Sequence, residues 1–143
     1  MPIAPQARRC FLCPRACGAE RTESSPGFCG ADEAWQDFRV ARVMLHHWEE
    51  PVLSGTRGSG TIFFAGCAGR CLFCQNYPIS QLRHGRQYGV DELAQMMLEL
   101  QRRGAHNINL VTPTHFVAHI LMALNEAARA GLRIPIVYNT SGY

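Results

Sequence analysis

The chain has 143 residues, of which 47% are hydrophobic and 17% are charged, a composition typical of a soluble globular domain. Its formal net charge is only +3, and its basic residues are scattered along the chain, which argues against a nucleic-acid surface. Residues 1–9 contain no apolar run, so we expect neither a secretory signal nor a membrane anchor, and we expect the protein in the cytoplasm.

The first predicted domain, residues 1–58, is an irregular segment rich in proline and cysteine. Its stretch Ala31–Trp48 is long enough for regular structure, but the pattern does not decide between helix and strand. The segment has few apolar residues, and four of its side chains are thiols: Cys10, Cys13, Cys17 and Cys29. Four thiolates can close a zinc tetrahedron or saturate an auxiliary iron-sulfur cluster, and the metal would then supply much of the folding free energy. We expect a metal site here, with free thiols as the alternative.

The second predicted domain, residues 59–143, begins with a strand followed by a helix. The run Thr61–Ala65 is short and rich in β-branched and aromatic residues, which favours a buried strand. A helix is expected from Val90 to about Arg103, because apolar residues recur there at helical spacing and Gly104 would end it. These apolar residues are Val90, Leu93, Ala94, Met97 and Leu98.

Two more strands and one more helix follow. Asn107–Val111 alternates as a strand, and Thr112 is expected to cap a helix that runs from Pro113 to near Gly131. The residues expected on the apolar face of that helix are Val117, Ile120, Leu121 and Leu124. A third strand begins at Ile134–Tyr138.

The alternation of strands and helices predicts an α/β fold with a parallel sheet and right-handed crossovers. We expect the first three β/α units of a partial TIM-type barrel, preceded by the small cysteine-rich segment. Because the third strand would leave side chains such as Ile136 at an open edge, we expect that the sequence is truncated.

The other three cysteines form the most specific motif of the chain. Cys67, Cys71 and Cys74 are spaced C-x3-C-x2-C directly after the first strand predicted in residues 59–143, with Gly66 and Gly69 to permit a tight loop. Three thiolates can hold a [4Fe-4S] cluster and leave one iron open to a substrate or cofactor. Structural zinc is the weaker alternative, because zinc requires four ligands and this loop offers three.

This loop, Cys67-Ala-Gly-Arg-Cys71-Leu-Phe-Cys74, resembles the signature of the radical S-adenosylmethionine (SAM) superfamily. Further segments resemble the pyruvate formate-lyase-activating-enzyme-like members of that superfamily. They are Gly58–Cys67, Cys74–Tyr77, Asn107–His115, Tyr138–Tyr143 and the N-terminal Cys-Pro-Arg-Ala-Cys stretch. The resemblance covers most of the chain.

The resemblance implies a radical SAM oxidoreductase of the activating-enzyme type, with Cys67, Cys71 and Cys74 as the ligands of its catalytic [4Fe-4S] cluster. SAM would chelate the open iron, and one electron from the reduced cluster would cleave it into methionine and a 5′-deoxyadenosyl radical that abstracts a hydrogen atom. The implied partners are an electron donor such as flavodoxin or ferredoxin and a glycyl radical enzyme as the protein substrate, with no nucleic acid and no membrane.

The resemblance also implies a set of residues that bind SAM, most of them just after predicted strands. They are Phe73, Asn76, Thr112, Thr114, Asn139, Thr140 and Ser141. Phe73 is expected to shield the cluster or to stack near the adenine. Many members carry a Gly-Gly-Glu-Pro-like sequence after the second strand, where this chain has Thr112-Pro-Thr-His115, so Thr112, Thr114 or helix amides would replace it. Helix capping by Thr112 and an ordinary turn at residues 139–141 are the alternatives.

Two other classes of function stay open at this point. The chain could be a non-catalytic iron-sulfur or zinc-binding module, which the N-terminal cysteines would suit. It could also be an inactive fragment of a larger radical SAM enzyme.

Overall fold

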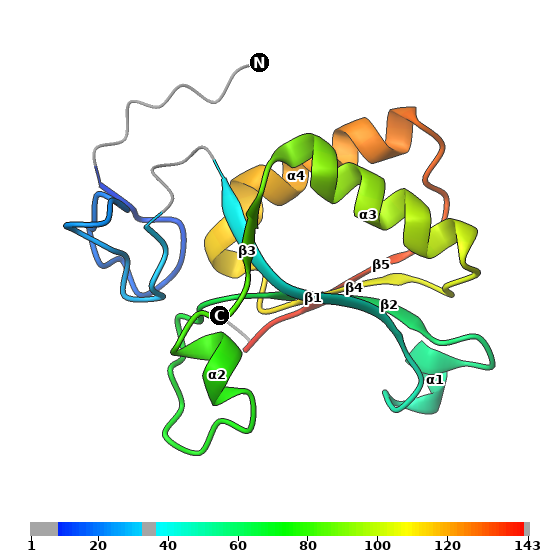
Figure 1. The fold of residues 1–143 in the computed structure, drawn as a ribbon, viewed down its shortest axis with the longest axis horizontal. Coiled ribbons are helices and arrows are strands. Elements are labelled where there is room, and N and C mark those ends of the chain that lie inside the picture. Colours follow the sequence, from blue (N-terminus) through cyan, green and yellow to red (C-terminus); the bar gives the residue numbers. More distant parts are fainter. Residues whose placement is uncertain (1–8, 33–36, 142–143) are drawn as a thin grey trace.

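A computed structural model describes residues 9–32 and 37–141 of the chain (Figure 1). Five strands form one sheet in the order β3-β1-β2-β4-β5. Their bounds are β1 Phe38–His46, β2 Ser59–Phe64, β3 Arg86–Tyr88, β4 Ile108–Val111 and β5 Ile136–Asn139. Strands β2, β4 and β5 are parallel, whereas β1 is antiparallel to both β2 and β3. The sheet is therefore mixed, with a parallel half and an antiparallel half.

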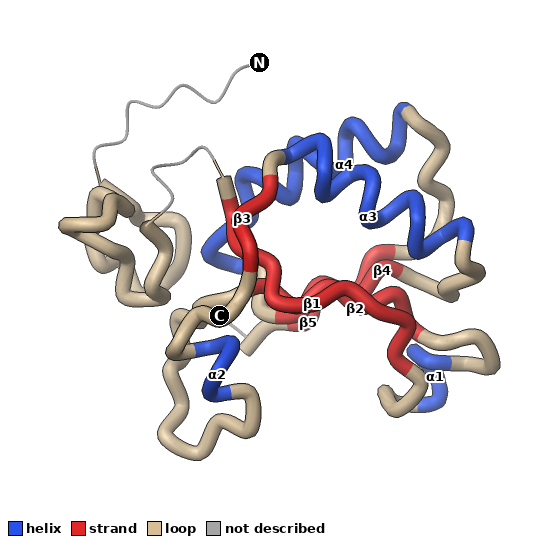
Figure 2. The backbone as a smooth tube through the Cα atoms, in the orientation of Figure 1, coloured by secondary structure: helices blue, strands red, loops and turns tan. Residues whose placement is uncertain are grey.

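Two long helices cover one side of the sheet, α3 Val90–Arg102 and α4 Val117–Arg129 (Figure 1). A 3-10 turn, Thr114–Phe116, precedes α4, and two short helices, α1 Pro51–Ser54 and α2 Tyr77–Ser80, lie in loops on the other side. Residues 9–32 contain no helix or named strand and appear as loop in Figure 2. None of the described helices is both long and apolar enough to cross a membrane.

The hydrophobic core lies between the two long helices and the sheet. Its centre is a group of aromatic rings, in which Phe38 of β1 packs edge-on against Phe64 of β2 and against Phe116, with centroids 6.0 Å apart in both pairs. Fully buried aliphatic side chains surround these rings, among them Ile62, Leu93, Met97, Leu100, Ile108, Leu110 and Ile120. The core therefore joins the antiparallel strand β1 to the parallel half of the sheet.

The predicted α/β order of residues 59–143 is confirmed, but the antiparallel half of the sheet was not predicted. Strand β1 carries a register shift between Val40 and Arg42, and this irregularity breaks the alternation that would have identified a strand in the stretch Ala31–Trp48. Strand β3 has three residues, too few for a periodic signal. The division into residues 1–58 and 59–143 stays a prediction, although β1 precedes that boundary and pairs with β2. Barrel closure also stays a prediction.

Two details of the predicted second helix are wrong. Leu121 is 58% exposed, because the buried face of α4 is formed by His119, Ile120, Ala123 and Ala127. Thr112 does not cap the helix, because the 3-10 turn separates it from α4 and its N–H donates to the carbonyl of Asn139 at 2.9 Å.

A pair of substitutions tests the orientation of α4. Ile120→Val should lower the free energy of unfolding by about 1 kcal/mol, since it removes a methylene group from a fully buried side chain. Leu121→Ala removes more atoms but should change stability by less than about 0.5 kcal/mol, because the side chain lies mostly in solvent. Urea denaturation would measure both. A larger loss at Leu121 than at Ile120 would contradict the observed orientation.

Candidate functional site

The three-cysteine loop lies at the carboxyl end of β2, the edge of parallel strands where functional groups collect in β/α folds. Cys67 and Cys74 are half-buried, Cys71 is exposed, and all three are free thiols. A Cβ atom placed on Gly69 would lie 3.5 Å from the sulfur of Cys67 and 3.7 Å from that of Cys71, so two thiols flank this glycine. The Gly69 N–H donates to the sulfur of Cys67 at 3.3 Å.

Helix α2 supports the far side of this loop. The hydroxyl of Ser80 donates to the sulfur of Cys74 at 3.3 Å, and the side-chain amide of Gln81 donates to the carbonyl of Cys71 at 3.0 Å. Sequence reasoning missed Ser80 and Gln81, since no local pattern relates them to the cysteines.

The chemistry of this loop fits an iron-sulfur cluster. Three thiols, the ligand type of such clusters, lie on one short loop, and Gly69 leaves open the space that a side chain would fill beside two of them. Among the described residues, no three cysteine, histidine or acidic side chains already converge on one metal position. Binding a cluster would therefore require these side chains to rotate toward a common centre.

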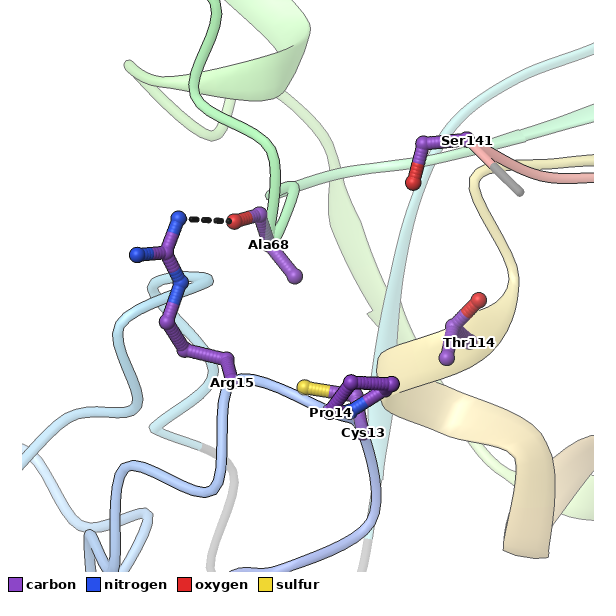
Figure 3. Close-up of a pocket in the computed structure, with 6 residues that line it drawn as sticks. All are labelled: Cys13, Pro14, Arg15, Ala68, Thr114 and Ser141. Atoms are coloured by element: carbon purple, nitrogen blue, oxygen red, sulfur yellow. Dashed lines mark hydrogen bonds between the residues drawn. The ribbon is translucent and has the colours of Figure 1, made fainter. Parts of the chain in front are cut away.

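A cavity of about 300 Å³ lies beside the loop, between segments that are far apart in the sequence (Figure 3). Ala68 of the cysteine loop, Thr114 after β4 and Ser141 after β5 line one part of it. The hydroxyls of Thr114 and Thr140 are 3.0 Å apart, which joins the ends of the two strands. Three of the predicted SAM-binding residues therefore meet near the cysteine loop.

The other predicted SAM-binding residues are not among those that line this cavity. The side chain of Phe73 is 92% exposed, and Asn76 directly precedes α2, where its carbonyl accepts the N–H groups of Ile79 and Ser80 at 2.9 Å. Asn139 contacts Thr112 through the main chain, where its carbonyl accepts the N–H of Thr112. Thr112 has a φ of 55°, an uncommon conformation for a β-branched residue and one that is typical of functional sites. For all four of these residues, a role in binding SAM stays a prediction.

The N-terminal segment lines another part of the same cavity through Cys13, Pro14 and Arg15 (Figure 3). The guanidinium of Arg15 donates to the carbonyl of Ala68 at 3.1 Å, and the N–H of Cys67 donates to the carbonyl of Cys29 at 3.1 Å. The two cysteine groups therefore touch each other, although long stretches of sequence separate them.

The thiols of this segment differ in their electrostatic surroundings. Burial raises the pKa of Cys29, and this effect outweighs the main-chain N–H of Ala31 and the charge of Arg21, which lower it. Burial would also raise the pKa of Cys17, but the N–H groups of Phe28 and Ala19 and the charge of Arg21 outweigh it and lower the pKa. Cys17 is therefore the thiol of this segment that ionises most readily among those with a resolved shift.

A buried arginine and a buried histidine connect this segment to the end of β2. Arg21 is fully buried and donates to the carbonyl of His115 at 2.8 Å, and Nε2 of His115 lies 3.0 Å from the carbonyl oxygen of Ala65. Burial lowers the pKa of His115 to about 4, and the charges of Arg21 and Arg83 add to this effect, while the contact with Ala65 opposes it. Sequence reasoning left His115 open and gave no role to Arg21.

The stability of the protein should fall as the pH decreases from about 6.5 to about 4. The pKa of His115 lies lower in the folded protein than in the unfolded chain, so the unfolded chain binds more protons in this interval. The contribution of a neutral His115 is fully present above about pH 6.5 and is lost as the pH falls through the folded pKa. Thermal unfolding of the native chain and of His115→Gln at several pH values would measure it. An equally steep loss in the variant would contradict the assignment.

Comparisons with known proteins agree with this site. Residues 61–143, more than half of the chain, match the model of the Radical SAM superfamily. The chain is 33% identical over 145 residues to "Uncharacterized protein MJ0674" of Methanocaldococcus jannaschii. The alignment covers 95% of this chain and 39% of that relative, so the chain spans well under half of the relative's length. No solved structure shows significant similarity. Because this match covers more than half of the chain and includes the three-cysteine loop, the chain belongs to the radical SAM superfamily.

Proposed function

We propose that this chain generates a substrate radical from SAM with a [4Fe-4S] cluster held by Cys67, Cys71 and Cys74. The observation that carries the proposal is the position of the three-cysteine loop, which borders a cavity that is also lined by residues just after β4 and β5 and by the N-terminal segment. When bound, the cluster and SAM together supply the reductive cleavage of SAM into methionine and a 5′-deoxyadenosyl radical.

The residues around the cavity would bind and orient SAM. The cavity volume of about 300 Å³ is within the usual range for small-molecule sites. The hydroxyls of Thr114, Thr140 and Ser141 offer donors and acceptors for the polar groups of SAM. Ser80 and Gln81 would fix the cysteine loop, and the N-terminal segment would keep water from the reacting groups.

Within this activity, we propose an activating enzyme that installs a glycyl radical on a protein, as in the pyruvate formate-lyase-activating-enzyme-like subgroup. The electron would come from a flavodoxin or a ferredoxin in the cytoplasm. The support is the resemblance of several segments to that subgroup, together with a loop that a protein partner could reach. In that loop, Leu72 is 99% exposed and Phe73 is 92% exposed.

The test is anaerobic reconstitution of the chain with iron and sulfide, reduction with dithionite and addition of SAM. We expect iron-sulfur absorption and the formation of 5′-deoxyadenosine, measured by chromatography with mass detection. A chain that takes up zinc at the three-cysteine loop and shows no iron-sulfur absorption would contradict the proposal. The glycyl radical would be sought by electron paramagnetic resonance after a candidate glycyl radical enzyme is added.

A further inference from the structure

The segment of residues 9–32 is folded almost without an apolar core. Among these described residues, the buried apolar side chains are Cys10, Cys29 and Ala31, whereas Phe11 is 64% exposed and Phe28 is 38% exposed. No disulfide closes the segment, because its four cysteines are free thiols. A short segment of this kind needs a source of stability other than hydrophobic burial, and a bound metal is one such source.

The backbone folds so that the four cysteines lie in neighbouring turns. The N–H of Cys10 donates to the carbonyl of Ala19 at 2.7 Å, and the N–H of Gly18 donates to the carbonyl of Cys10 at 3.0 Å, so the stretch from Cys10 to Ala19 closes on itself. The N–H of Ala16 donates to the carbonyl of Cys13 at 2.9 Å, which makes a tight turn after Cys13. Cys10 and Cys13 therefore lie within one compact stretch of backbone, and closely spaced cysteines are the usual ligands of structural zinc.

The other two cysteines lie close by, and the four thiols, which do not yet converge on one position among the described residues, would rotate toward a common centre on binding. The sulfur of Cys17 accepts the main-chain N–H of Phe28, which places it beside the residue that precedes Cys29. A Cβ atom placed on Gly27 would lie only 3.1 Å from the sulfur of Cys29, so this glycine makes room for that thiol. Arg21 is fully buried near both thiols, and a buried cation is stabilised by thiolate ligands with a net negative charge.

We propose that Cys10, Cys13, Cys17 and Cys29 bind one tetrahedral zinc ion, and that the zinc-loaded segment forms a fixed wall of the cavity beside the cluster loop. The part of this proposal that concerns the cavity wall rests on the proposed function, because the proposed function makes that cavity the site of SAM. Four thiolates leave no open coordination position, which is the property of a structural site and not of a second catalytic cluster. A saturated auxiliary iron-sulfur cluster is the competing occupant, and metal analysis separates it from zinc. Each thiol releases its proton to solvent on binding.

Two of the proposed ligands stand next to the groups that hold the cluster loop. Cys29 itself accepts the N–H of Cys67, and Phe28, the residue before it, accepts from Arg70 at 3.5 Å and lies 3.8 Å beneath the guanidinium of Arg15. Cys13 is followed by Pro14 and Arg15, and all three line the cavity (Figure 3). Fixing the sulfurs of Cys13 and Cys29 on one ion therefore fixes the contacts with the loop.

Metal analysis of two variants tests the zinc site separately from the cluster. In Cys17→Ser the affinity for zinc should fall at least tenfold while iron uptake at the three-cysteine loop persists. In the matched variant Cys71→Ser iron uptake should be lost while zinc persists. Cobalt added in place of zinc should give thiolate charge-transfer and tetrahedral ligand-field bands that Cys17→Ser lacks. Absence of these bands in the native chain, or an iron-sulfur cluster at this segment that Cys17→Ser removes, would overturn the proposal.

Hydrogen exchange tests the coupling without any activity measurement. Removal of zinc from the native chain with a chelator should accelerate amide exchange over residues 66–70 at least tenfold, because the N–H of Cys67 loses its acceptor. Arg15→Ala should accelerate exchange at the same residues by a smaller factor, and Arg102→Ala, an exposed arginine on α3, should not. Chelation serves as the second route if Cys17→Ser does not fold. Tight zinc binding without any change of exchange at residues 66–70 would overturn the coupling, whatever the outcome of the SAM assay.

Discussion

Cys71→Ala should reduce the formation of 5′-deoxyadenosine to background, a loss of more than about 100-fold, because it removes a ligand on which a three-thiolate cluster depends. The side chain of Cys71 is exposed, so the substitution should change the free energy of unfolding by less than about 0.5 kcal/mol. Iron content, iron-sulfur absorption and product formation would be measured after anaerobic reconstitution. The loss would then be assigned to the missing ligand and not to unfolding.

The neighbouring residue provides a matched control. Leu72 lies in the same loop and is 99% exposed, but its side chain offers no ligand atom. Leu72→Ala should therefore keep its iron and its product formation. If Cys71→Ala also kept both, the three-cysteine loop would not be the cluster site, and the proposed function would lose its main support.

The sequence allowed the parallel half of the fold to be predicted because its signals are local. Helix α3 was expected from Val90 and is observed from Val90, since an acidic first turn and apolar residues at helical spacing mark its start. The order β2, α3, β4, α4, β5 follows from the same kind of pattern. Strand β1 was not predicted, because the irregularity between Val40 and Arg42 disrupts the alternation of its buried and exposed residues.

The candidate site was predictable only where its residues are close in sequence. The spacing of Cys67, Cys71 and Cys74 identified the loop, but no spacing relates Arg15 to Ala68 or Arg21 to His115, pairs that are 53 and 94 residues apart. Such contacts depend on how one irregular segment packs against the end of a strand. Periodicity reports which face of an element is buried, not which loop covers it.

The N-terminal segment and the three-cysteine loop pack closely against each other at Gly66. This glycine has a φ of 86°, in the left-handed region, and a Cβ atom placed there would collide with the carbonyl oxygen of Cys29 and lie 3.4 Å from Nε2 of His115. Two costs would therefore add in Gly66→Ala. The left-handed conformation costs about 1 kcal/mol for a residue with a side chain, and the collision costs about 1–3 kcal/mol more.

Gly131 separates these two costs experimentally. It has a φ of 102°, and a Cβ atom placed there would meet nothing within 4 Å, so Gly131→Ala should lose only the conformational part, about 1 kcal/mol. Gly66→Ala should lose about 2–4 kcal/mol in urea denaturation and also bind less iron, because relief of the collision must move Cys29 away from Cys67. Equal losses of unfolding free energy in the two variants would mean that the N-terminal segment moves away from the added methyl group at no cost in stability. The close packing of the N-terminal segment against the cluster loop would then have no energetic importance.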